Sequence, residues 1–510
     1  MAGKNRSVFI LKNTLSNYVR QGVQIAVFLV LTPFVASRLG TEGFGLWALL
    51  QAVIGLFGLF DLGFGTSVVK YVADARGKQD DRRLANLVST FFWVYMVLGA
   101  AVMGAAALFS LFLPELLNIP EAYEDASRMV FLLVAFRTAV GMPLGMFAGV
   151  MTGFQRQWWA NMFKTASTLL YAAGAFWALT VQPSVEFLAL ANLISHTAAM
   201  GVGALVCIRV LPGVSIRLRE ARLSMVREVS SFSMYIFIIQ VSTLIYTRVD
   251  SLIVQSFLSL SAVALYSVAA RVAEEASGLC RQLTNALTPV IAELHGSGEN
   301  QNIREVFRLG TKLSTALAVP LLTGLAFLAE PLLSVWMGES FREAAPAAQI
   351  LLAAMMVSVI HGNAANVLSM TGHQRYLSRV FFGGQLLNLG LTLLLIRSLG
   401  LPGAALATLI STSCTDIILV QPKAGKTTGI RNGYFYGSAV LPSLLPLGIM
   451  AAALAGAVRI IPPDSLAAIA LLEFIACLVF FTAFFFIGLT GRERSYLLSR
   501  LKRNRVSEDD

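Results

Sequence analysis

The chain has 510 residues, of which 56% are hydrophobic and only 13% are charged. Soluble domains carry about 25% charged residues, so this composition excludes a soluble chain and indicates an integral membrane protein. A formal net charge of +11 is common in nucleic-acid-binding proteins, but cytoplasmic loops rich in Lys and Arg produce the same bias, so nucleic acid is not an expected partner.

Apolar segments of about 20 residues, long enough to cross a hydrocarbon core of about 30 Å as helices, recur along the chain. They predict an all-α integral membrane protein with about fourteen transmembrane helices. The first segment has no small-residue cleavage site and is expected to be a retained helix, not a signal peptide. The predicted spans are residues 15–37, 43–68, 85–113, 128–150, 158–181, 186–208, 229–257, 263–291, 309–336, 347–370, 376–398, 402–420, 436–460 and 465–490.

Lys and Arg are concentrated in alternate loops, which predicts the orientation because positively charged loops stay in the cytoplasm. One side holds the N-terminus and the basic segments 70–83, 209–227, 421–431 and 491–505. The other side has isolated arginines and an acidic loop before the fourth span. Both termini are therefore predicted to be cytoplasmic.

Neither the cysteines nor the histidines show metal-ligand spacing. The cysteines are far apart and lie in or beside apolar spans, and the histidines form no i, i+4 pair, so no metal is expected. These residues are Cys207, Cys280, Cys414, Cys477, His196, His295, His361 and His373.

The hexapeptide MTGFQR at 151–156 returns as MTGHQR at 370–375, 219 positions later. The same offset aligns Gly77 with Gly296. The first six spans and the next six are therefore predicted to be two copies of one unit. Six is an even number, so the copies share one orientation, as in parallel-repeat transporters.

The repeat predicts the organisation of the chain. The expected parts are a six-helix lobe at 1–210, a second at 211–431, two extra transmembrane helices at 432–490 and a cytoplasmic basic tail at 491–510. The hexapeptide is interpreted as a tight turn at the headgroup level, in which Gly breaks the helix, rather than as a ligand contact. Duplicated bundles commonly bind substrate between their halves, so this layout favours a transporter.

The eighth span, in YSVAARVAEEASGLCRQLTN, carries a polar stripe within a sector of about 120°. Polar groups at membrane depth are costly unless they face a partner or a wet cavity. The alternative is a self-neutralising stripe that binds neighbouring helices, with Arg271 and Glu275 at i, i+4. The stripe consists of Ser267, Arg271, Glu274, Glu275, Arg281, Gln282 and Asn285.

Several other spans carry polar residues. The first and seventh spans are repeat partners, and each has a polar face. Asp61 and Asp416 are lone acids, each of which either bonds a neighbouring helix or holds a proton or sodium ion. A cavity with several arginines suits a phosphate-bearing substrate, because guanidinium pairs with phosphate in a bidentate fork.

These residues define two candidate sets. The candidates for substrate binding are Arg20, Gln21, Arg137, Gln240, Arg248, Arg271 and Arg281. The candidates for coupling to a gradient of H⁺ or Na⁺ are Asp61, Asp250, Glu274, Glu275 and Asp416. No other cofactor is expected.

The segment LVLTPFVASRLGTEGFGLWALLQAVIGLFGLFDLGFGTSVVKYVADARGK at 29–78 resembles the N-terminal pattern of a flippase family. This is the polysaccharide and oligosaccharide flippase family of the multidrug/oligosaccharidyl-lipid/polysaccharide exporter superfamily. RLGTEGFGLW at 38–47 and DLGFG at 61–65 are particularly similar, and the resemblance extends loosely over 11–431.

The resemblance implies a bacterial inner-membrane transporter without enzymatic activity. Its cargo would be an undecaprenyl-diphosphate-linked oligosaccharide, moved from the cytoplasmic to the periplasmic leaflet for exopolysaccharide, O-antigen or capsule synthesis. Ion-driven alternating access around a cationic cavity is implied, with Arg20, Arg248, Arg271 and Arg281 assigned to the diphosphate. The implied partners are the lipid-linked substrate, membrane lipids, a polysaccharide polymerase and a chain-length regulator. The two extra helices resemble those of fourteen-span lipid II flippases.

Two alternative functions are open, one within transport and one enzymatic. An ion-coupled exporter of drugs or small molecules would share the fold, although its cavity would favour acids and aromatics over arginines. A membrane-embedded glycan polymerase or ligase would need a sizeable periplasmic segment to hold an acceptor. The longest predicted outer loop, at about 114–127, does not provide one.

Overall fold

The computed structural model describes the backbone of residues 2–495 and most of the side chains in that range, those of residues 2–11 and of much of 231–248 excepted. All regular elements in this part of the chain are helices, so the predicted all-α class is confirmed. The chain forms two compact units, Met1–Ala264 and Leu265–Asp510. The lobe boundary expected at 210/211 stays a prediction.

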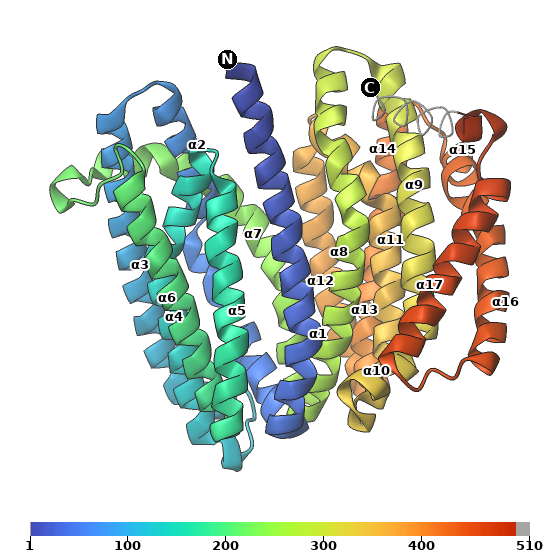
Figure 1. The fold of residues 1–510 in the computed structure, drawn as a ribbon, viewed down its shortest axis with the longest axis horizontal. Coiled ribbons are helices and arrows are strands. Elements are labelled where there is room, and N and C mark those ends of the chain that lie inside the picture. Colours follow the sequence, from blue (N-terminus) through green and yellow to red (C-terminus); the bar gives the residue numbers. More distant parts are fainter. Residues whose placement is uncertain (1, 496–510) are drawn as a thin grey trace. The chain divides into compact units, whose positions relative to one another are not determined.

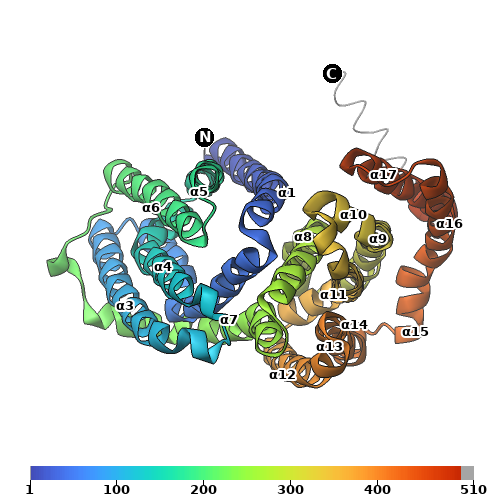
Figure 2. The same ribbon diagram turned by 90° about the horizontal axis from the view of Figure 1, so that it is seen from below.

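The first unit is a bundle in which α4 is the central helix. Helix α4 packs against α1, α2, α3, α5 and α6, as the end-on view shows (Figure 2). Gly40 interrupts α1 with φ 71° and ψ 172°, so α1 is two helices joined end to end. The helices are α1 (Ala2–Leu56), α2 (Phe64–Gly77), α3 (Asp81–Leu116), α4 (Glu124–Gly153), α5 (Gln157–Val181), α6 (Val185–Val210) and α7 (Leu223–Phe257).

The second unit places α11 at its centre, against α9, α12, α13 and α14. Helices α16 and α17 pack on each other and on α9 (Figure 1). A π-helical segment, Cys414–Val420, joins α13 to α14. The helices are α8 (Leu260–Gly296), α9 (Asn300–Phe327), α10 (Ala329–Met337), α11 (Ala345–Met370), α12 (Gln374–Leu399), α13 (Leu401–Ser413), α14 (Gln421–Thr428), α15 (Asn432–Phe435), α16 (Leu444–Ile460) and α17 (Leu466–Ala483).

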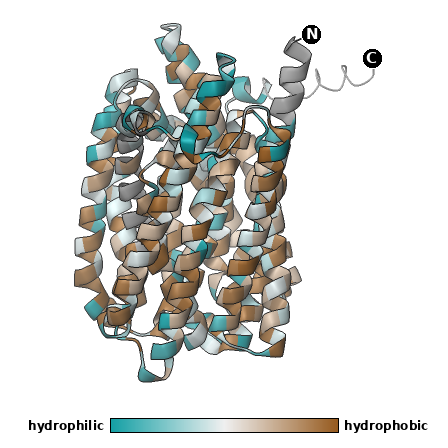
Figure 3. Cartoon of the chain, turned by 90° about the vertical axis from the view of Figure 1, so that its left-hand side faces the viewer, coloured by the Kyte–Doolittle hydropathy of each residue, from teal (hydrophilic) through white to brown (hydrophobic). Residues whose placement is uncertain are grey.

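Within the described part of the chain, ten helices have the length and the apolar composition needed to cross a membrane. The other predicted spans coincide with α5, α7, α8 and the second half of α1, so the prediction of about fourteen is compatible with the structure. Hydrophobic residues run along the helices, and hydrophilic residues gather mainly at their ends (Figure 3). The chain is therefore a multi-pass membrane protein.

The second predicted span, 43–68, is not one continuous helix. The chain leaves the helical conformation at Leu62 and Gly63, with φ values of 50° and 78°. Asp61 stabilises the break, because its Oδ2 accepts a hydrogen bond of 3.2 Å from the Gly65 N–H at the start of α2. A free N–H at a helix start is satisfied in this way by a carboxylate.

Helix boundaries recur at the offset of 219 residues. The kink at Gly40 corresponds to Ser259, which lies between the end of α7 and the start of α8. Helix α2 ends at Gly77 and α8 at Gly296, the glycine pair aligned by the repeat. The central helices α4 and α11 also correspond. The two copies thus share one order of helices.

The repeated hexapeptide forms a helix-ending turn in both copies, but the turn lies two residues earlier in the second. In the first copy Gln155 has φ 59°, and the Arg156 N–H donates to the Met151 carbonyl. In the second copy Gly372 has φ 85°, as expected for a helix-breaking glycine. In the first copy Gly153 is the last residue of α4, but the left-handed residue is Gln155, two positions later. Gly153 lies so close to α2 that a Cβ there would be 2.8 Å from Val72 Cγ1.

Two glycines of α3 provide a matched test of helix packing. A Cβ on Gly99 would lie 2.5 Å from the Ala139 carbonyl oxygen of α4, whereas a Cβ on Gly104 would meet nothing within 4 Å. We expect Gly99→Ala to lower the free energy of unfolding by about 1–3 kcal/mol through overpacking. Gly104→Ala is expected to raise it by about 0.5–1 kcal/mol, because alanine restricts the unfolded chain. Thermal unfolding in detergent measures both, and equal midpoints for the two variants would contradict the close α3–α4 packing.

Candidate functional site

The polar face of α1 is bound to α5 through amide side chains. Asn17 Oδ1 accepts hydrogen bonds from Asn161 Nδ2 at 2.7 Å and from Gln157 Nε2 at 3.2 Å. Arg20, one turn further along α1, donates to Gln24 Oε1 at 3.2 Å. Gln21 also interacts with a neighbour. The predicted stripe on the first span therefore exists, and Asn17 links it to α5 within the first unit.

Arg137 on α4 lies inside the helical bundle of the first unit. Its Nη2 is 3.5 Å from Nδ1 of His196 on α6, and Tyr171 on α5 lies near the guanidinium. The Nε of Arg137 is buried and makes no hydrogen bond with the described residues. Gly141 makes room for the imidazole, because a Cβ there would lie 3.0 Å from His196 Nε2. The guanidinium is thus surrounded by neutral groups.

Arg281 on α8 also has neutral partners. Its Nη2 donates to Ser277 Oγ at 2.6 Å, and its Nη1 is 3.9 Å from the sulfur of Met355 on α11. The serine lies one turn before the arginine on α8. Neither partner cancels the positive charge.

Arg271 is different, because two carboxylates of its own helix surround it. Its guanidinium is 2.6 Å from Glu275 Oε1 and 3.8 Å from Glu274 Oε2. This is the self-neutralising arrangement that the i, i+4 spacing indicates. Glu274 and Glu275 are thereby engaged with Arg271 in this structure, and a role for the three residues in transport stays a prediction.

The arginines thus fall into two groups. Within residues 2–495, Arg20, Arg137 and Arg281 form no ion pair with a described carboxylate, whereas Arg271 forms two. A cation in an apolar helix without a counter-ion is costly, and such a position is a candidate site for an anionic ligand. The side chains of Gln240 and Arg248 lie outside the described residues.

The candidate acids have three different environments. Asp61 accepts a hydrogen bond of 2.6 Å from the Tyr95 hydroxyl in addition to the one from Gly65, which favours a packing role. Asp250 is half-buried near the end of α7 and interacts with a neighbour. Asp416 is 8% exposed and lies in the π-helical segment between α13 and α14. π-Helical turns are frequent at functional sites, so Asp416 is the strongest candidate for ion coupling among these three acids.

Tyr436 interacts with both His361 and Asp416 in the second unit. The His361 Nδ1 is 2.8 Å from the Val357 carbonyl, so Nδ1 carries the proton and Nε2 accepts from the Tyr436 hydroxyl at 3.0 Å. The Asp416 carboxylate is close enough to Tyr436 to interact with it electrostatically. The three side chains, from α11 and two π-helical segments, form a polar cluster in an apolar bundle.

Two intramembrane charges were not predicted from the sequence. Lys312 on α9 is 2% exposed and pairs with Glu493. Glu473 on α17 is packed against Gly324 of α9, and one of its carboxylate oxygens is buried and accepts no hydrogen bond from the described residues. Glu473 could have been found from the sequence, because it is the one charged residue in the apolar segment 466–488. Lys312 lay near the start of a predicted span, where a lysine reaches the membrane surface without a special partner.

Two duplicated helical bundles with charged side chains inside apolar helices define a polytopic membrane transporter. The structure is similar to that of the lipid II flippase MurJ in an inward closed conformation, with a TM-score of 0.70 and 14% identity, covering 93% of this chain and 98% of that one. It is also similar to an inward-facing multidrug resistance MATE family transporter of the MOP superfamily, with a TM-score of 0.72 and 13% identity, covering 79% of this chain and 94% of that one. These likenesses confirm the fold.

The sequence comparisons define the family. The family model described as "Polysaccharide biosynthesis protein" matches residues 10–295, more than half of the chain, and a MatE model matches residues 235–394. The chain belongs to the polysaccharide biosynthesis protein family, and the resemblance to flippases of this superfamily is confirmed.

Curated relatives match over most of their length at low identity. The uncharacterized membrane protein EpsK of Bacillus subtilis is 22% identical, over 82% of this chain and 84% of the relative. The probable low-salt glycan biosynthesis flippase Agl15 of Haloferax volcanii is 22% identical, over 80% and 81%. A putative O-antigen transporter of Shigella flexneri is 25% identical over 36% of this chain and 45% of the relative. The relatives with functional names are flippases or transporters, not enzymes.

Proposed function

We propose that the protein is a flippase for an undecaprenyl-diphosphate-linked oligosaccharide, which it moves from the cytoplasmic to the periplasmic leaflet of a bacterial inner membrane. The names of Agl15 and of the O-antigen transporter support a lipid-linked glycan as cargo. The distribution of Lys and Arg supports cytoplasmic termini. The product would enter exopolysaccharide, O-antigen or capsule synthesis, with a polymerase and a chain-length regulator as downstream partners.

The observation that carries this proposal is that Arg20, Arg137 and Arg281 form no ion pair with a carboxylate among the described residues. A charged guanidinium at membrane depth is stabilised by an anion, and phosphate pairs with guanidinium in a bidentate fork. A cationic drug would be repelled by the same residues. The arginines therefore favour a phosphate-bearing cargo over a small cationic one.

Ion coupling is proposed at Asp416. We expect Asp416→Asn to keep binding of the lipid-linked cargo but to lose the dependence of transport on an imposed H⁺ or Na⁺ gradient, because the amide cannot change its charge. The matched control is Asp464→Asn, an exposed acid in the turn before α17. Transport by Asp416→Asn that still follows the gradient would remove Asp416 from the coupling mechanism.

The lipid-linked oligosaccharide pool of a strain lacking the gene tests the proposed function. Accumulation of a completed undecaprenyl-diphosphate oligosaccharide, sized by mass spectrometry, is the expected result. The second candidate function, an exporter of small molecules, is supported by the MatE match and the MATE-like fold. An unchanged lipid pool with altered resistance to toxic compounds would favour that exporter.

A further inference from the structure

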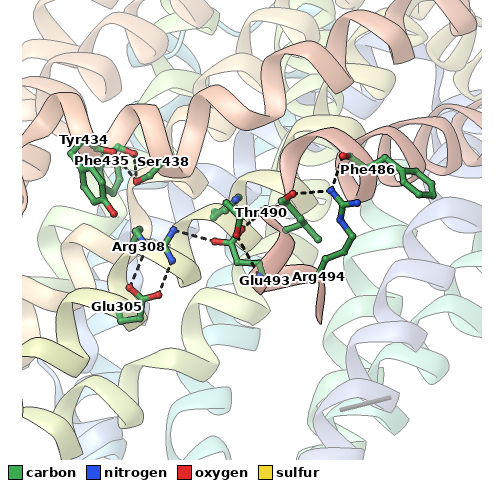
Figure 4. A network of polar contacts seen from close by, with 11 residues as sticks. Glu305, Arg308, Tyr434, Phe435, Ser438, Phe486, Thr490, Glu493 and Arg494 are labelled. Carbon is green, nitrogen blue, oxygen red and sulfur yellow. Dashed lines mark hydrogen bonds and ion pairs between the residues drawn. The ribbon is translucent and has the colours of Figure 1, made fainter. Parts of the chain in front are cut away.

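Glu493 lies just beyond α17, where three donors converge on its carboxylate. Oε2 accepts from Lys312 Nζ at 2.6 Å and from the Thr490 backbone N–H at 2.9 Å. Oε1 accepts from Arg308 Nη1 at 3.1 Å. Figure 4 shows Glu493 between Arg308 and Thr490. Both oxygens of the carboxylate thus accept from a cation, and Oε2 accepts from a backbone donor as well.

The two cations belong to a basic face of α9. Arg304, Arg308 and Lys312 are spaced at i, i+4 and i+8, so they follow one another along one side of the helix. Glu305 holds Arg308 from the other side, with Oε1 and Oε2 at 2.7 and 3.2 Å from Nη2 and Nε. The Nη1 of Arg308 stays directed at Glu493 (Figure 4).

The segment that carries Glu493 is short and locally fixed. Thr490 and Glu493 form a capping box, since the Glu493 N–H also reaches Thr490 Oγ1 at 3.4 Å. Arg494 Nη2 donates to the carbonyls of Phe486 and Leu489 at 2.9 and 3.2 Å. These hydrogen bonds are local, whereas Leu489 belongs to a buried cluster with Ala316 and Val319 of α9. The part of the segment after Leu489 can therefore leave α9 without unfolding a transmembrane helix.

The carboxylate of Glu493 is ionised in this site. Burial alone would raise the pKa of Glu493, but hydrogen bonds from Lys312 and from Thr490 outweigh it and lower the pKa to about 2. Glu493 is therefore ionised throughout the physiological range, and pH does not empty the site. When Glu493 leaves, another anion has to take its place beside Lys312. The reason is that Lys312 is 2% exposed, and an unpaired charge at such a position is costly.

We propose that Arg308 and Lys312 form a binding site for a phosphate group, which Glu493 occupies from within the chain. A phosphate oxygen accepts the same charge-assisted hydrogen bonds as a carboxylate, and it carries more charge. The basic face of α9 gives a phosphate a path from the start of the helix towards Lys312. The ligand is a lipid headgroup with an exposed phosphate, and the C-terminal segment releases α9 when that headgroup binds. This site does not depend on the cargo proposed above.

Chemical rescue with the full-length protein tests the site. We expect Glu493→Ala to lower the thermal midpoint and inorganic diphosphate to raise it again by several degrees, because the anion replaces the missing carboxylate. The wild type is expected to gain less, because diphosphate first has to displace Glu493, and a Glu493→Ala, Lys312→Met double variant is expected to gain nothing. Equal responses of all three proteins to diphosphate would overturn the proposal and leave Glu493 as a structural anchor only.

A second measurement uses the wild type and does not depend on a variant that folds. Hydrogen exchange of the 489–495 backbone is compared in nanodiscs of phosphatidylcholine, whose phosphate is capped by choline, with and without phosphatidic acid. Faster exchange with phosphatidic acid supports displacement of Glu493 by a lipid phosphate. Faster exchange with free diphosphate but not with phosphatidic acid would assign the site to soluble phosphate and overturn the lipid as its source. Unchanged exchange with both would contradict displacement.

Discussion

Replacing both Arg137 and Arg281 with alanine is expected to lower the rate of lipid-linked oligosaccharide transport by about 10²- to 10⁴-fold. Each arginine has neutral partners, so its full charge is available to a phosphate. A hydrogen bond to a charged group contributes about 1.5–3 kcal/mol, which is about a 10- to 100-fold change for each residue. Transport by purified protein in proteoliposomes is the measurement.

The control for this loss is Arg219→Ala. Arg219 is exposed in the loop before α7, and its replacement removes one positive charge without touching a span. We expect wild-type transport from this variant. Full activity of the Arg137, Arg281 double variant at equal protein amounts would contradict phosphate binding by these residues.

Replacing Glu493 with glutamine is expected to lower the free energy of unfolding by about 3–5 kcal/mol, because it leaves Lys312 buried without a counter-ion. The control is Glu339→Gln, which removes an exposed partner of Arg342 and is expected to cost about 0–1 kcal/mol. A Glu493→Gln, Lys312→Met double variant should recover much of the loss. Thermal unfolding of the three proteins measures these differences, and equal losses for the two single variants would contradict a buried pair.

The same ion pair predicts a particular pH dependence. The folded pKa of Glu493 is lowered to about 2, so its contribution to stability is fully present above the unfolded pKa of about 4.3. It is lost as the pH falls through that range towards 2. Between pH 5 and 8 we therefore expect a constant difference in unfolding midpoint between the wild type and Glu493→Gln. If the difference in unfolding midpoint has disappeared by pH 5, the Glu493 carboxylate is not stabilised by an ion pair with Lys312.

The sequence predicted best those features that depend on neighbouring residues. Hydrophobic segments of membrane-spanning length predicted the helices, and the spacing of Arg271 and Glu275 predicted their contact. The repeat predicted the corresponding order of helices. The break at Leu62 was missed, because the apolar run continues through it and the Asp61 cap becomes visible only in three dimensions.

Contacts between distant segments could not be predicted. Lys312 and Glu493 are 181 residues apart, and no periodicity relates them. His361 and Tyr436 come together only because α11 and the segment after α15 pack in one bundle. The hexapeptide predicted a helix-ending turn in both copies, but not that the left-handed residue is Gln155 in the first copy and Gly372 in the second.

The most direct test of the flippase assignment is transport by the purified protein. An undecaprenyl-diphosphate-linked oligosaccharide is placed in proteoliposomes, and an impermeant glycan-modifying enzyme reports how much of it has reached the outer leaflet under an imposed ion gradient. We predict rapid exposure of the oligosaccharide with the wild-type protein and little with the Arg137, Arg281 double variant. Exposure no faster than in protein-free liposomes, with export of a small cationic compound by the same preparation, would contradict the assignment.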